Sequence, residues 1–206
     1  MMSINYVDEF SKIPTTCVSD ALKGNYTMDF SIKALKNNAI VGRAYTVKIP
    51  KGQNKEVLKA IKEANAGHVL VIDAEDDTSK AIAGDFILGM AKALGINGVV
   101  TNGVIRDIES IKELDFPLFC KGTTANAGSK SDEGDSNIPI SCGGVTVNPG
   151  DIIVGDSDGV VVVPKELEVE VLEKAKKKLQ TDADREAKVS NNVQAIYEYI
   201  DNILRK

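Results

Sequence analysis

Several hallmarks of common protein classes are scarce in this sequence. The three cysteines, Cys17, Cys120 and Cys142, are odd in number and widely spaced, and they form no CxxC pair. That spacing excludes a disulfide framework and predicts reduced, buried thiols. A single histidine, His68, cannot build a histidine metal cluster, and its place at the start of a predicted strand favours a structural role.

Long apolar runs and an excess of basic residues are also missing. The uninterrupted aliphatic runs, such as Val160 to Val163, are far shorter than the roughly 20 residues that span a bilayer. Residues 1–14 include Asp8 and Glu9 and have no apolar core, unlike a signal peptide, so we expect a cytoplasmic protein with no membrane partner. Acidic residues outnumber basic ones, 30 to 25, which disfavours nucleic acid as a partner because phosphate binding depends on clustered Lys and Arg.

No internal repeat, low-complexity segment or linker divides the 206 residues. The hydrophobic fraction of 43% and the charged fraction of 27% are those of an ordinary globular domain. A chain of this length supports one sizeable hydrophobic core but would be cramped as two full domains. We therefore predict a single domain over residues 1–206.

The first half of the chain alternates between β-branched runs and segments with helical spacing of apolar residues. Thr15, Thr16 and Asn54 are candidate helix caps. The predicted strands cover 39–49, 68–73, 98–101 and 117–120, and the predicted helices cover 15–22, 54–64, 84–94 and 107–114. The stripe expected to face the core from the third helix consists of Phe86, Ile87, Met90 and Leu94.

The second half combines a polar loop, short strands and a helical end. The region 122–137 is rich in Gly, Ser and Asp and is predicted to be a long loop. Three strands between residues 144 and 163 are separated by turn sequences, which predicts antiparallel hairpins. Beyond residue 164 the pattern is helical, with a break near Thr181. Together the elements predict an α/β fold, a mixed-sheet β/β/α sandwich with C-terminal helices.

One βαβ unit places the chemically interesting residues. Strands 68–73 and 98–101 should be parallel, with helix 84–94 returning against them as the crossover. The N-terminus of that helix and the loop after strand 98–101 then lie at the carboxyl edge of the sheet, where open α/β sheets bind ligands. Gly84 to Ile87 and Arg106-Asp107 should therefore face one cleft.

The residues of this cleft suit an anionic substrate and a divalent cation. The first turn of the helix leaves backbone N–H groups that can hold a carboxylate, and Gly84 allows close approach to the backbone. Arg106 offers a planar fork of donors for a carboxylate and an adjacent keto oxygen. Asp107 is a hard oxygen ligand for Mg²⁺ or Mn²⁺, and Asp85 can act through metal-bound water. The candidate substrate-binding residues are Gly84, Asp85, Phe86, Ile87 and Arg106, and the candidate catalytic residues are Asp85, Arg106 and Asp107.

Each of these residues also has an ordinary structural interpretation. Asp107 can cap the short helix that follows it, and Asp85 can simply complement a helix dipole. Arg106 can form a surface salt bridge, and Gly84 can be a turn residue. No single residue decides between the two interpretations.

The combined pattern resembles the RraA-like family, which includes 4-hydroxy-4-methyl-2-oxoglutarate aldolases. That family has an acidic residue, twenty intervening positions and then Arg-Asp, which is the spacing of Asp85 and Arg106 here. Val18 to Leu22 is similar to the family's opening helix, and Val145 to Pro164 resembles its closing hairpins. The resemblance extends over most of the chain.

The resemblance implies a fold related to the swivelling β/β/α domain, assembled as homotrimers or homohexamers. It implies that Gly84 to Ile87 and Arg106 bind the pyruvyl part of a small 2-keto acid and that Asp107 ligates Mg²⁺ or Mn²⁺. The implied activity is that of a class II, metal-dependent aldolase, which commonly decarboxylates oxaloacetate too because both reactions pass through pyruvate enolate. Family sites receive an acidic residue from a neighbouring subunit's C-terminal helix, for which Glu186 is a candidate.

The sequence departs from the aldolase pattern at two places. Ser110 stands where an acidic residue is common, with Glu109 one place earlier, and Asn102 stands where an Asp is frequent. The first change bears on substrate choice more than on metal binding. The alternative function is a non-catalytic regulator that binds a ribonuclease or another protein partner, as other family members do, and inhibitory members can keep the same residues.

Overall fold

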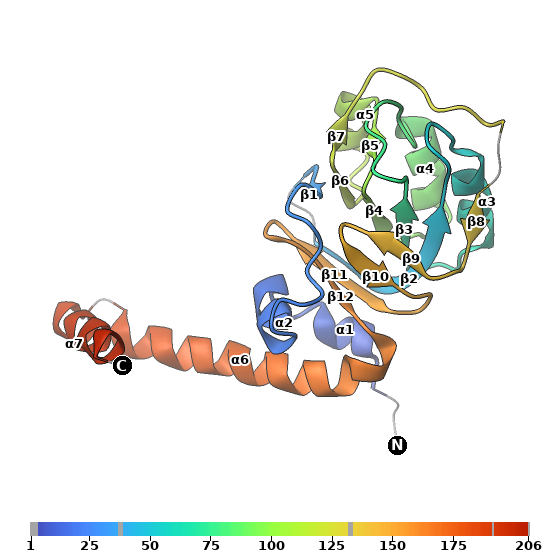
Figure 1. Ribbon diagram of the computed structural model, residues 1–206. Coiled ribbons are helices and arrows are strands. Elements are labelled where there is room, and N and C mark those ends of the chain that lie inside the picture. Colours follow the sequence, from blue (N-terminus) through green and yellow to red (C-terminus); the bar gives the residue numbers. More distant parts are fainter. Residues whose placement is uncertain (1–3, 37–38, 132–133, 191, 206) are drawn as a thin grey trace.

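The computed structural model describes residues 4–36, 39–131, 134–190 and 192–205. The body is built on an eight-stranded mixed sheet in the order β1-β6-β4-β3-β2-β11-β12, with β8 paired to β2 (Figure 1). The central pairs β2–β3, β3–β4 and β4–β6 are parallel, and the outer pairs are antiparallel. The strands are β1 Lys33–Ala34, β2 Ile40–Lys48, β3 His68–Asp73, β4 Gly98–Thr101, β6 Leu118–Cys120, β8 Asp135–Ser136, β11 Ile152–Asp156 and β12 Gly159–Val163.

Two small sheets and a set of helices surround this sheet. β9 Ile140–Cys142 pairs antiparallel with β10 Val145–Val147, and β5 Val104–Ile105 pairs parallel with β7 Gly122–Thr123. The helices are α1 Tyr6–Phe10, α2 Thr15–Ala21, α3 Lys55–Glu63, α4 Asp85–Ala93, α5 Ile108–Glu113, α6 Glu168–Val189 and α7 Val193–Leu204, with a 3₁₀ turn at Lys165–Leu167.

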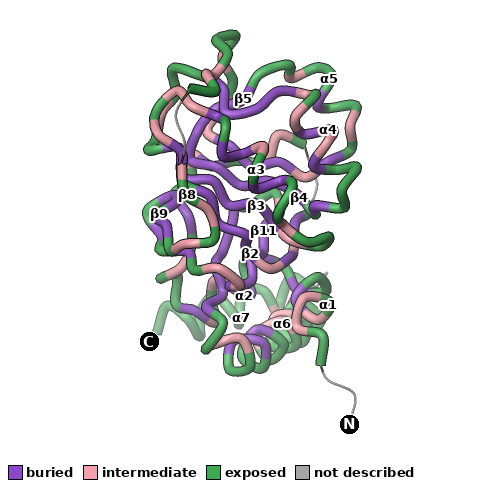
Figure 2. Tube along the Cα trace, turned by 90° about the vertical axis from the view of Figure 1, so that its right-hand side faces the viewer, coloured by how far each residue is buried: buried purple, intermediate pink, exposed green. Residues whose placement is uncertain are grey.

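Both faces of the central sheet are covered, which explains why its strands read as continuous aliphatic runs. Successive side chains of a strand point to opposite faces. Leu70 and Ile72 of β3 therefore pack in the cluster that contains α3, α4 and α5, whereas Val69 and Val71 pack with β9 and β10. A third cluster joins β11 and β12 to α1, α2 and α6. Figure 2 shows the buried strands at the centre, and the surrounding helices carry both buried and exposed residues.

This arrangement confirms the predicted mixed α/β fold with C-terminal helices. The predicted strands 68–73 and 98–101 match β3 and β4, which are parallel neighbours joined through α4. Among the described residues, no helix is both long enough and apolar enough to cross a membrane.

The buried face of α4 differs from the predicted stripe. Leu88 and Ala91 are buried in the core, and Ile87 packs against it, whereas Phe86 is 76% exposed and Leu94 is 56% exposed. The position of α3 and the sheet decides which face of the helix turns inward. The prediction was therefore wrong for Phe86 and Leu94.

Three further predictions need correction. Asn54 occupies the N-cap position of α3, but its side chain makes no capping hydrogen bond. The N-cap of α2 is Pro14 rather than Thr15 or Thr16. The last predicted helix continues through Thr181 as part of α6. The predicted antiparallel hairpin of β11 and β12 is present. β10 and β11 form no hairpin, because β10 pairs with β9, a strand that the prediction missed, and β11 pairs with β2 and β12.

Candidate functional site

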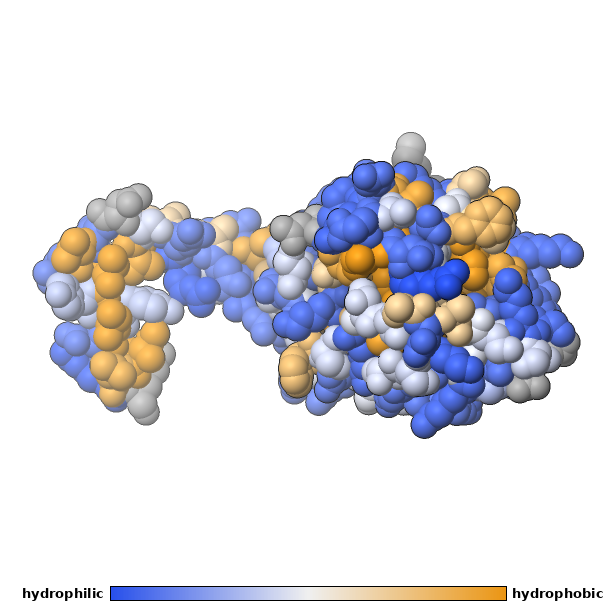
Figure 3. Space-filling view, turned by 90° about the horizontal axis from the view of Figure 1, so that it is seen from above, coloured by the Kyte–Doolittle hydropathy of each residue, from blue (hydrophilic) through white to orange (hydrophobic). Residues whose placement is uncertain are grey.

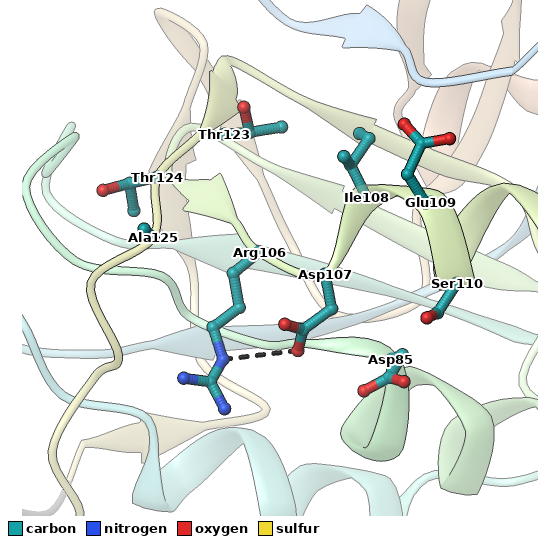
Figure 4. Close-up of a pocket in the computed structure, with 9 residues that line it drawn as sticks. All are labelled: Asp85, Arg106, Asp107, Ile108, Glu109, Ser110, Thr123, Thr124 and Ala125. Carbon is teal, nitrogen blue, oxygen red and sulfur yellow. Dashed lines mark ion pairs between the residues drawn. The ribbon is translucent and has the colours of Figure 1, made fainter.

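The N-terminus of α4, the loop before α5 and the segment 123–130 enclose a cleft at the carboxyl edge of the sheet (Figure 4). An outer groove of about 650 Å³ adjoins a narrower inner cavity of about 170 Å³, and the two share Asp85, Arg106 and Asp107. The outer groove is also lined by Ile108, Glu109, Ser110, Thr123, Thr124 and Ala125. The inner cavity is also lined by Asn54, Ala81, Ala83, Gly84, Phe86, Ile87, Ala127, Gly128 and Lys130. The structure thus brings together the predicted substrate-binding and catalytic residues, Gly84 to Ile87, Arg106 and Asp107.

Asp107 is held in the left-handed backbone region, with φ 62° and ψ 41°. Few residues other than Gly, Asn and Asp adopt this conformation readily. The residue occupies the N-cap position of α5 and its carbonyl oxygen accepts a hydrogen bond from the Ile111 N–H at 3.1 Å, but its side chain makes no capping bond. The carboxylate instead lies in the cleft, so capping does not account for this side chain.

Arg106 and Asp107 form an ion pair inside the cleft. The Arg106 Nε lies 3.3 Å from the Asp107 Oδ2, and the two side chains are 44% and 36% exposed. In Figure 4 both side chains point to the same side of the loop, and the terminal guanidinium nitrogens extend beyond the ion pair. Those nitrogens can still donate to an anionic ligand.

The absence of a side chain at Gly84 leaves room for the Asp107 carboxylate. An added Cβ at Gly84 would lie 2.1 Å from the Asp107 Oδ2 and 3.3 Å from the Arg106 Cγ. The backbone at Gly84 is extended, with φ −128°, so its conformation does not demand glycine. Contact with the Asp107 carboxylate is therefore the physical reason for glycine at this position, in addition to the predicted approach of a ligand.

The first turn of α4 offers both a carboxylate and backbone donors. The first helical hydrogen bond runs from the Leu88 N–H to the Gly84 carbonyl oxygen, so the N–H groups of the three preceding residues lie outside the helical ladder. The Asp85 Oδ1 accepts a hydrogen bond from the Phe86 N–H at 2.7 Å. Asp85 thus stabilises its own helix N-terminus, as the structural interpretation predicted, while its carboxylate also lines both parts of the cleft.

The sequence interpretation missed the contributions of Asn54 and Lys130 to the inner cavity. Backbone hydrogen bonds hold the segment that carries Lys130 against the rest of the cleft: the Asn54 N–H donates to the Ser129 carbonyl oxygen at 2.8 Å, and the Gly128 N–H donates to that of Ala81 at 3.1 Å. The periodicity of apolar residues in the sequence does not predict contacts between loops. The polar composition of residues 122–137 was the one available indication.

Other predicted residues lie outside this cleft. The His68 Nδ1 accepts a hydrogen bond from the Asn65 N–H at 2.9 Å, and burial lowers the pKa of the imidazole, in keeping with the predicted structural role. The three cysteines are free and buried, as predicted, and burial raises the pKa of Cys142 to about 12. Glu186 lies on α6, which leads away from the body that carries α4 and α5 (Figure 1).

A family model described as RraA-like, Aldolase/RraA, matches residues 15–162. The chain belongs to the RraA-like family. This membership confirms the resemblance inferred from the spacing of Asp85 and Arg106-Asp107 and from the segments 18–22 and 145–164, and it agrees with the mixed α/β fold.

Three relatives illustrate the range of this RraA-like family. A protein of Halalkalibacterium halodurans named "Putative 4-hydroxy-4-methyl-2-oxoglutarate aldolase" is 53% identical over 202 residues, which cover 98% of this chain and 96% of the relative. An uncharacterized protein from Pseudomonas syringae pv. tomato has a solved structure with a TM-score of 0.84 and 29% identity, covering 96% of this chain and 95% of that one. The RNA-processing inhibitor RraA from Thermus thermophilis has a TM-score of 0.68 and 28% identity, covering 73% of this chain and 92% of that one.

Proposed function

We propose that this RraA-like chain is a divalent-metal-dependent lyase that cleaves a carbon–carbon bond beside a pyruvyl unit. The proposed substrates are of the 4-hydroxy-4-methyl-2-oxoglutarate or 4-carboxy-4-hydroxy-2-oxoadipate type, with oxaloacetate decarboxylation as a second activity. The observation that carries the proposal is the convergence of Asp85, Arg106 and Asp107 at the N-terminus of α4. The 53% identical relative named as an aldolase supports the same reaction class.

The donor set of the cleft fits Mg²⁺ or Mn²⁺. Asp107 has an exposed carboxylate that is not used in capping, and Asp85 supplies a second carboxylate in the same cleft. The described residues hold no cluster of three or more His, Cys, Asp or Glu side chains that could bind a metal. Mg²⁺ needs no such cluster, because it keeps several waters and binds through one or two carboxylates. Asp107 is the proposed ligand.

In the proposed reaction, the substrate's carbon–carbon bond breaks as its 4-hydroxyl loses a proton and becomes a carbonyl. The bonding electron pair passes to the pyruvyl fragment, which leaves as an enolate and is then protonated to pyruvate. A bound divalent cation supplies Lewis-acid stabilisation of the enolate charge. Arg106 binds the pyruvyl carboxylate and keto oxygen, and the N–H groups of Asp85 and Ile87 in the first turn of α4 orient the carboxylate. Asp85 is the candidate proton carrier.

The test is pyruvate release from 4-hydroxy-4-methyl-2-oxoglutarate and from oxaloacetate, measured with Mg²⁺ and then with EDTA. The background of Mg²⁺-catalysed decarboxylation without protein is subtracted. We expect release from both substrates that EDTA abolishes. Release that persists in EDTA would contradict the metal requirement, and no release from either substrate would contradict the lyase.

Variants of the two adjacent site residues separate metal binding from substrate binding. We expect Asp107→Ala to abolish metal-dependent turnover with the fold intact, because the proposed metal ligand is lost. Arg106→Ala should lose turnover but keep Mn²⁺ binding, measured by the paramagnetic relaxation of water. Circular dichroism checks the fold of each variant, and full turnover in both would contradict the site assignment.

The second candidate function is that of a regulator that binds a protein partner. Its support is the structural similarity to the RNA-processing inhibitor RraA. A ribonuclease assay with and without this chain tests it, and inhibition in the absence of any lyase activity would favour the regulator.

We further propose a homo-oligomer, a trimer or a hexamer. α7 has no buried residue, and its apolar side chains are exposed. Figure 3 shows them gathered at the far end of α6, away from the body. Surfaces of this kind are typical of subunit interfaces.

A further inference from the structure

The side chain of Asn54 lines the inner cavity and has an unsatisfied acceptor. Asn at the N-cap ordinarily accepts a hydrogen bond from the first turn of the helix, but Asn54 makes no capping bond to α3. The residue is only 6% exposed, and its Oδ1 is buried without a hydrogen-bond partner in the part of the chain that the structure describes. Leaving a buried carbonyl oxygen unpaired is unfavourable. Because Asn54 also lines the inner cavity, a ligand bound there can supply the donor that the described residues do not.

The surroundings hold this carboxamide next to the reactive residues. The backbone of Asn54 is bonded to Ser129, and an added Cβ at Gly128 would lie 3.2 Å from the Asn54 Nδ2. The same Cβ would lie closer still, at 2.6 Å, to the Ala81 carbonyl oxygen, so glycine at 128 is required first by this backbone contact and also leaves room for the carboxamide. The same cavity is lined by Arg106 and Asp107. The two ends of a carboxamide have nearly the same size, so rotation about χ2 exchanges oxygen and nitrogen at the cavity wall.

The chemistry of the proposed substrates identifies the missing donor. Their carboxylates and keto oxygen are acceptors, and the cleft already offers donors for them from Arg106, Lys130 and the N-terminus of α4. The 4-hydroxyl is the one hydrogen-bond donor that such a substrate carries when its carboxylates are ionised. A neutral acceptor such as Asn54 matches that hydroxyl and offers no charge to a carboxylate.

We infer that Asn54 is a specificity-determining residue that accepts a hydrogen bond from the 4-hydroxyl of the substrate. The inference rests on the proposed lyase function and adds a preference for substrates that carry a 4-hydroxyl. Asn54 orients the hydroxyl for cleavage but does not take its proton, because a carboxamide is not a base at neutral pH. Oxaloacetate in its keto form has no such hydroxyl, so its decarboxylation does not use this contact.

The test compares kcat/KM for 4-hydroxy-4-methyl-2-oxoglutarate with kcat/KM for oxaloacetate in the same preparation. Asn54→Leu keeps the branched shape of the side chain, with somewhat larger terminal groups, and removes its polar atoms. We expect the ratio of the two constants to fall by about tenfold or more, the effect of one lost hydrogen bond in a buried site. Asn54→Ser, a good N-cap residue that cannot reach as far, should lower the ratio in the same direction.

A matched control separates selectivity from stability. Thr15 is 4% exposed and also has a buried oxygen without a partner, but it lies on α2, outside the cleft. Thr15→Val should leave the ratio unchanged. Partial unfolding lowers both constants equally, so it leaves the ratio unchanged as well.

The outcomes distinguish this inference from the proposed function. If the wild type is active and the ratio is unchanged in both Asn54 variants, the inference about Asn54 is overturned while the lyase function stands. The carboxamide would then only form part of the cavity wall or bind a structural water. Wild-type turnover of oxaloacetate only would overturn it too, while leaving a decarboxylase. A wild type inactive on both substrates would overturn the lyase and the role of Asn54 with it.

Discussion

The backbone and the side chain of Asp107 make different contacts. The backbone starts α5 and accepts the first helical hydrogen bond, from Ile111, while the carboxylate lies against Gly84 and pairs with Arg106. The left-handed conformation is one that Asp tolerates better than most residues, and it turns the side chain away from the N–H groups of α5. An aspartate used only as a cap would turn its carboxylate toward the helix N–H groups.

Gly84→Ala tests this packing. The added methyl group would overlap the Asp107 carboxylate, because the Cβ position lies 2.1 Å from the Oδ2. We expect turnover to fall at least about tenfold through displacement of the proposed metal ligand, an effect of about 1.4 kcal/mol or more on the reaction barrier. Pyruvate release at saturating Mg²⁺ measures it.

Gly89→Ala is the matched control in the same helix. A Cβ at Gly89 meets only the Leu114 Cδ2, at 4.0 Å. Alanine inside a helix is favoured over glycine by roughly 0.8–1 kcal/mol, so this variant should be active and slightly more stable. Equal activity in the two alanine variants would contradict the close contact between Gly84 and Asp107.

At the scale of the element, α4 shows how a helix can carry two apolar faces. Leu88 and Ala91 pack in the core, whereas Met90, Ala93 and Leu94 line a shallow apolar hollow shared with α3. Both sets recur at helical spacing, so periodicity alone favours neither. The sheet and α3 select the buried face, and this selection also directs the first turn of α4 into the cleft.

Leucine truncations at the two faces test that assignment. Leu88 is 1% exposed, so Leu88→Ala should lower the free energy of unfolding by about 2–5 kcal/mol, the usual cost of a cavity in a core. Leu94 is 56% exposed, so Leu94→Ala should cost less than about 1 kcal/mol. Urea denaturation followed by circular dichroism measures both free energies. A larger loss of stability for Leu94→Ala than for Leu88→Ala would show that the buried face is assigned wrongly.

At the scale of the whole molecule, α6 projects from the body and ends in α7 (Figure 1). α6 is buried only near its start, at Val171, Leu172 and Ala175. The apolar residues of α7 are exposed and follow helical spacing: Val193, Ile196, Tyr197, Ile200, Ile203 and Leu204. Packing within one chain leaves this surface in water, which favours its burial against another copy.

Charges on this surface should weaken the proposed assembly. Ile196 and Ile200 lie one turn apart on α7 and are 40% and 44% exposed. We expect the Ile196→Asp, Ile200→Asp double variant to shift the protein toward monomers, because association would bury two unpaired carboxylates. Size-exclusion chromatography with light scattering gives the mass.

The control for this variant changes polar residues of the same helix. Gln194 and Glu198 bond to each other at 3.0 Å on the surface, so replacing both with alanine should leave the mass unchanged. A wild type that is already monomeric at working concentration would contradict the oligomer, and an unchanged mass in the aspartate variant would place the interface elsewhere.

The predictions that held depend on local sequence. Strands 68–73 and 98–101 are aliphatic because both faces of β3 and β4 are covered, and their short length and β-branched residues favour strands. The hand and direction of a βαβ connection are nearly invariant, so the meeting of the α4 N-terminus with Arg106-Asp107 followed from the order of elements. The twenty-residue spacing from Asp85 to Arg106, together with the segments 18–22 and 145–164, identified the family without coordinates.

The remaining features depend on contacts between residues far apart in the chain. Leu88 rather than Phe86 is buried because of what packs against α4. Asn54 lines the cavity because its backbone is bonded to Ser129, 75 positions later, and its side chain does not cap α3. Local sequence sets which conformations a segment favours, but these choices are nearly equal in local free energy. The partners supplied by the folded chain decide among them.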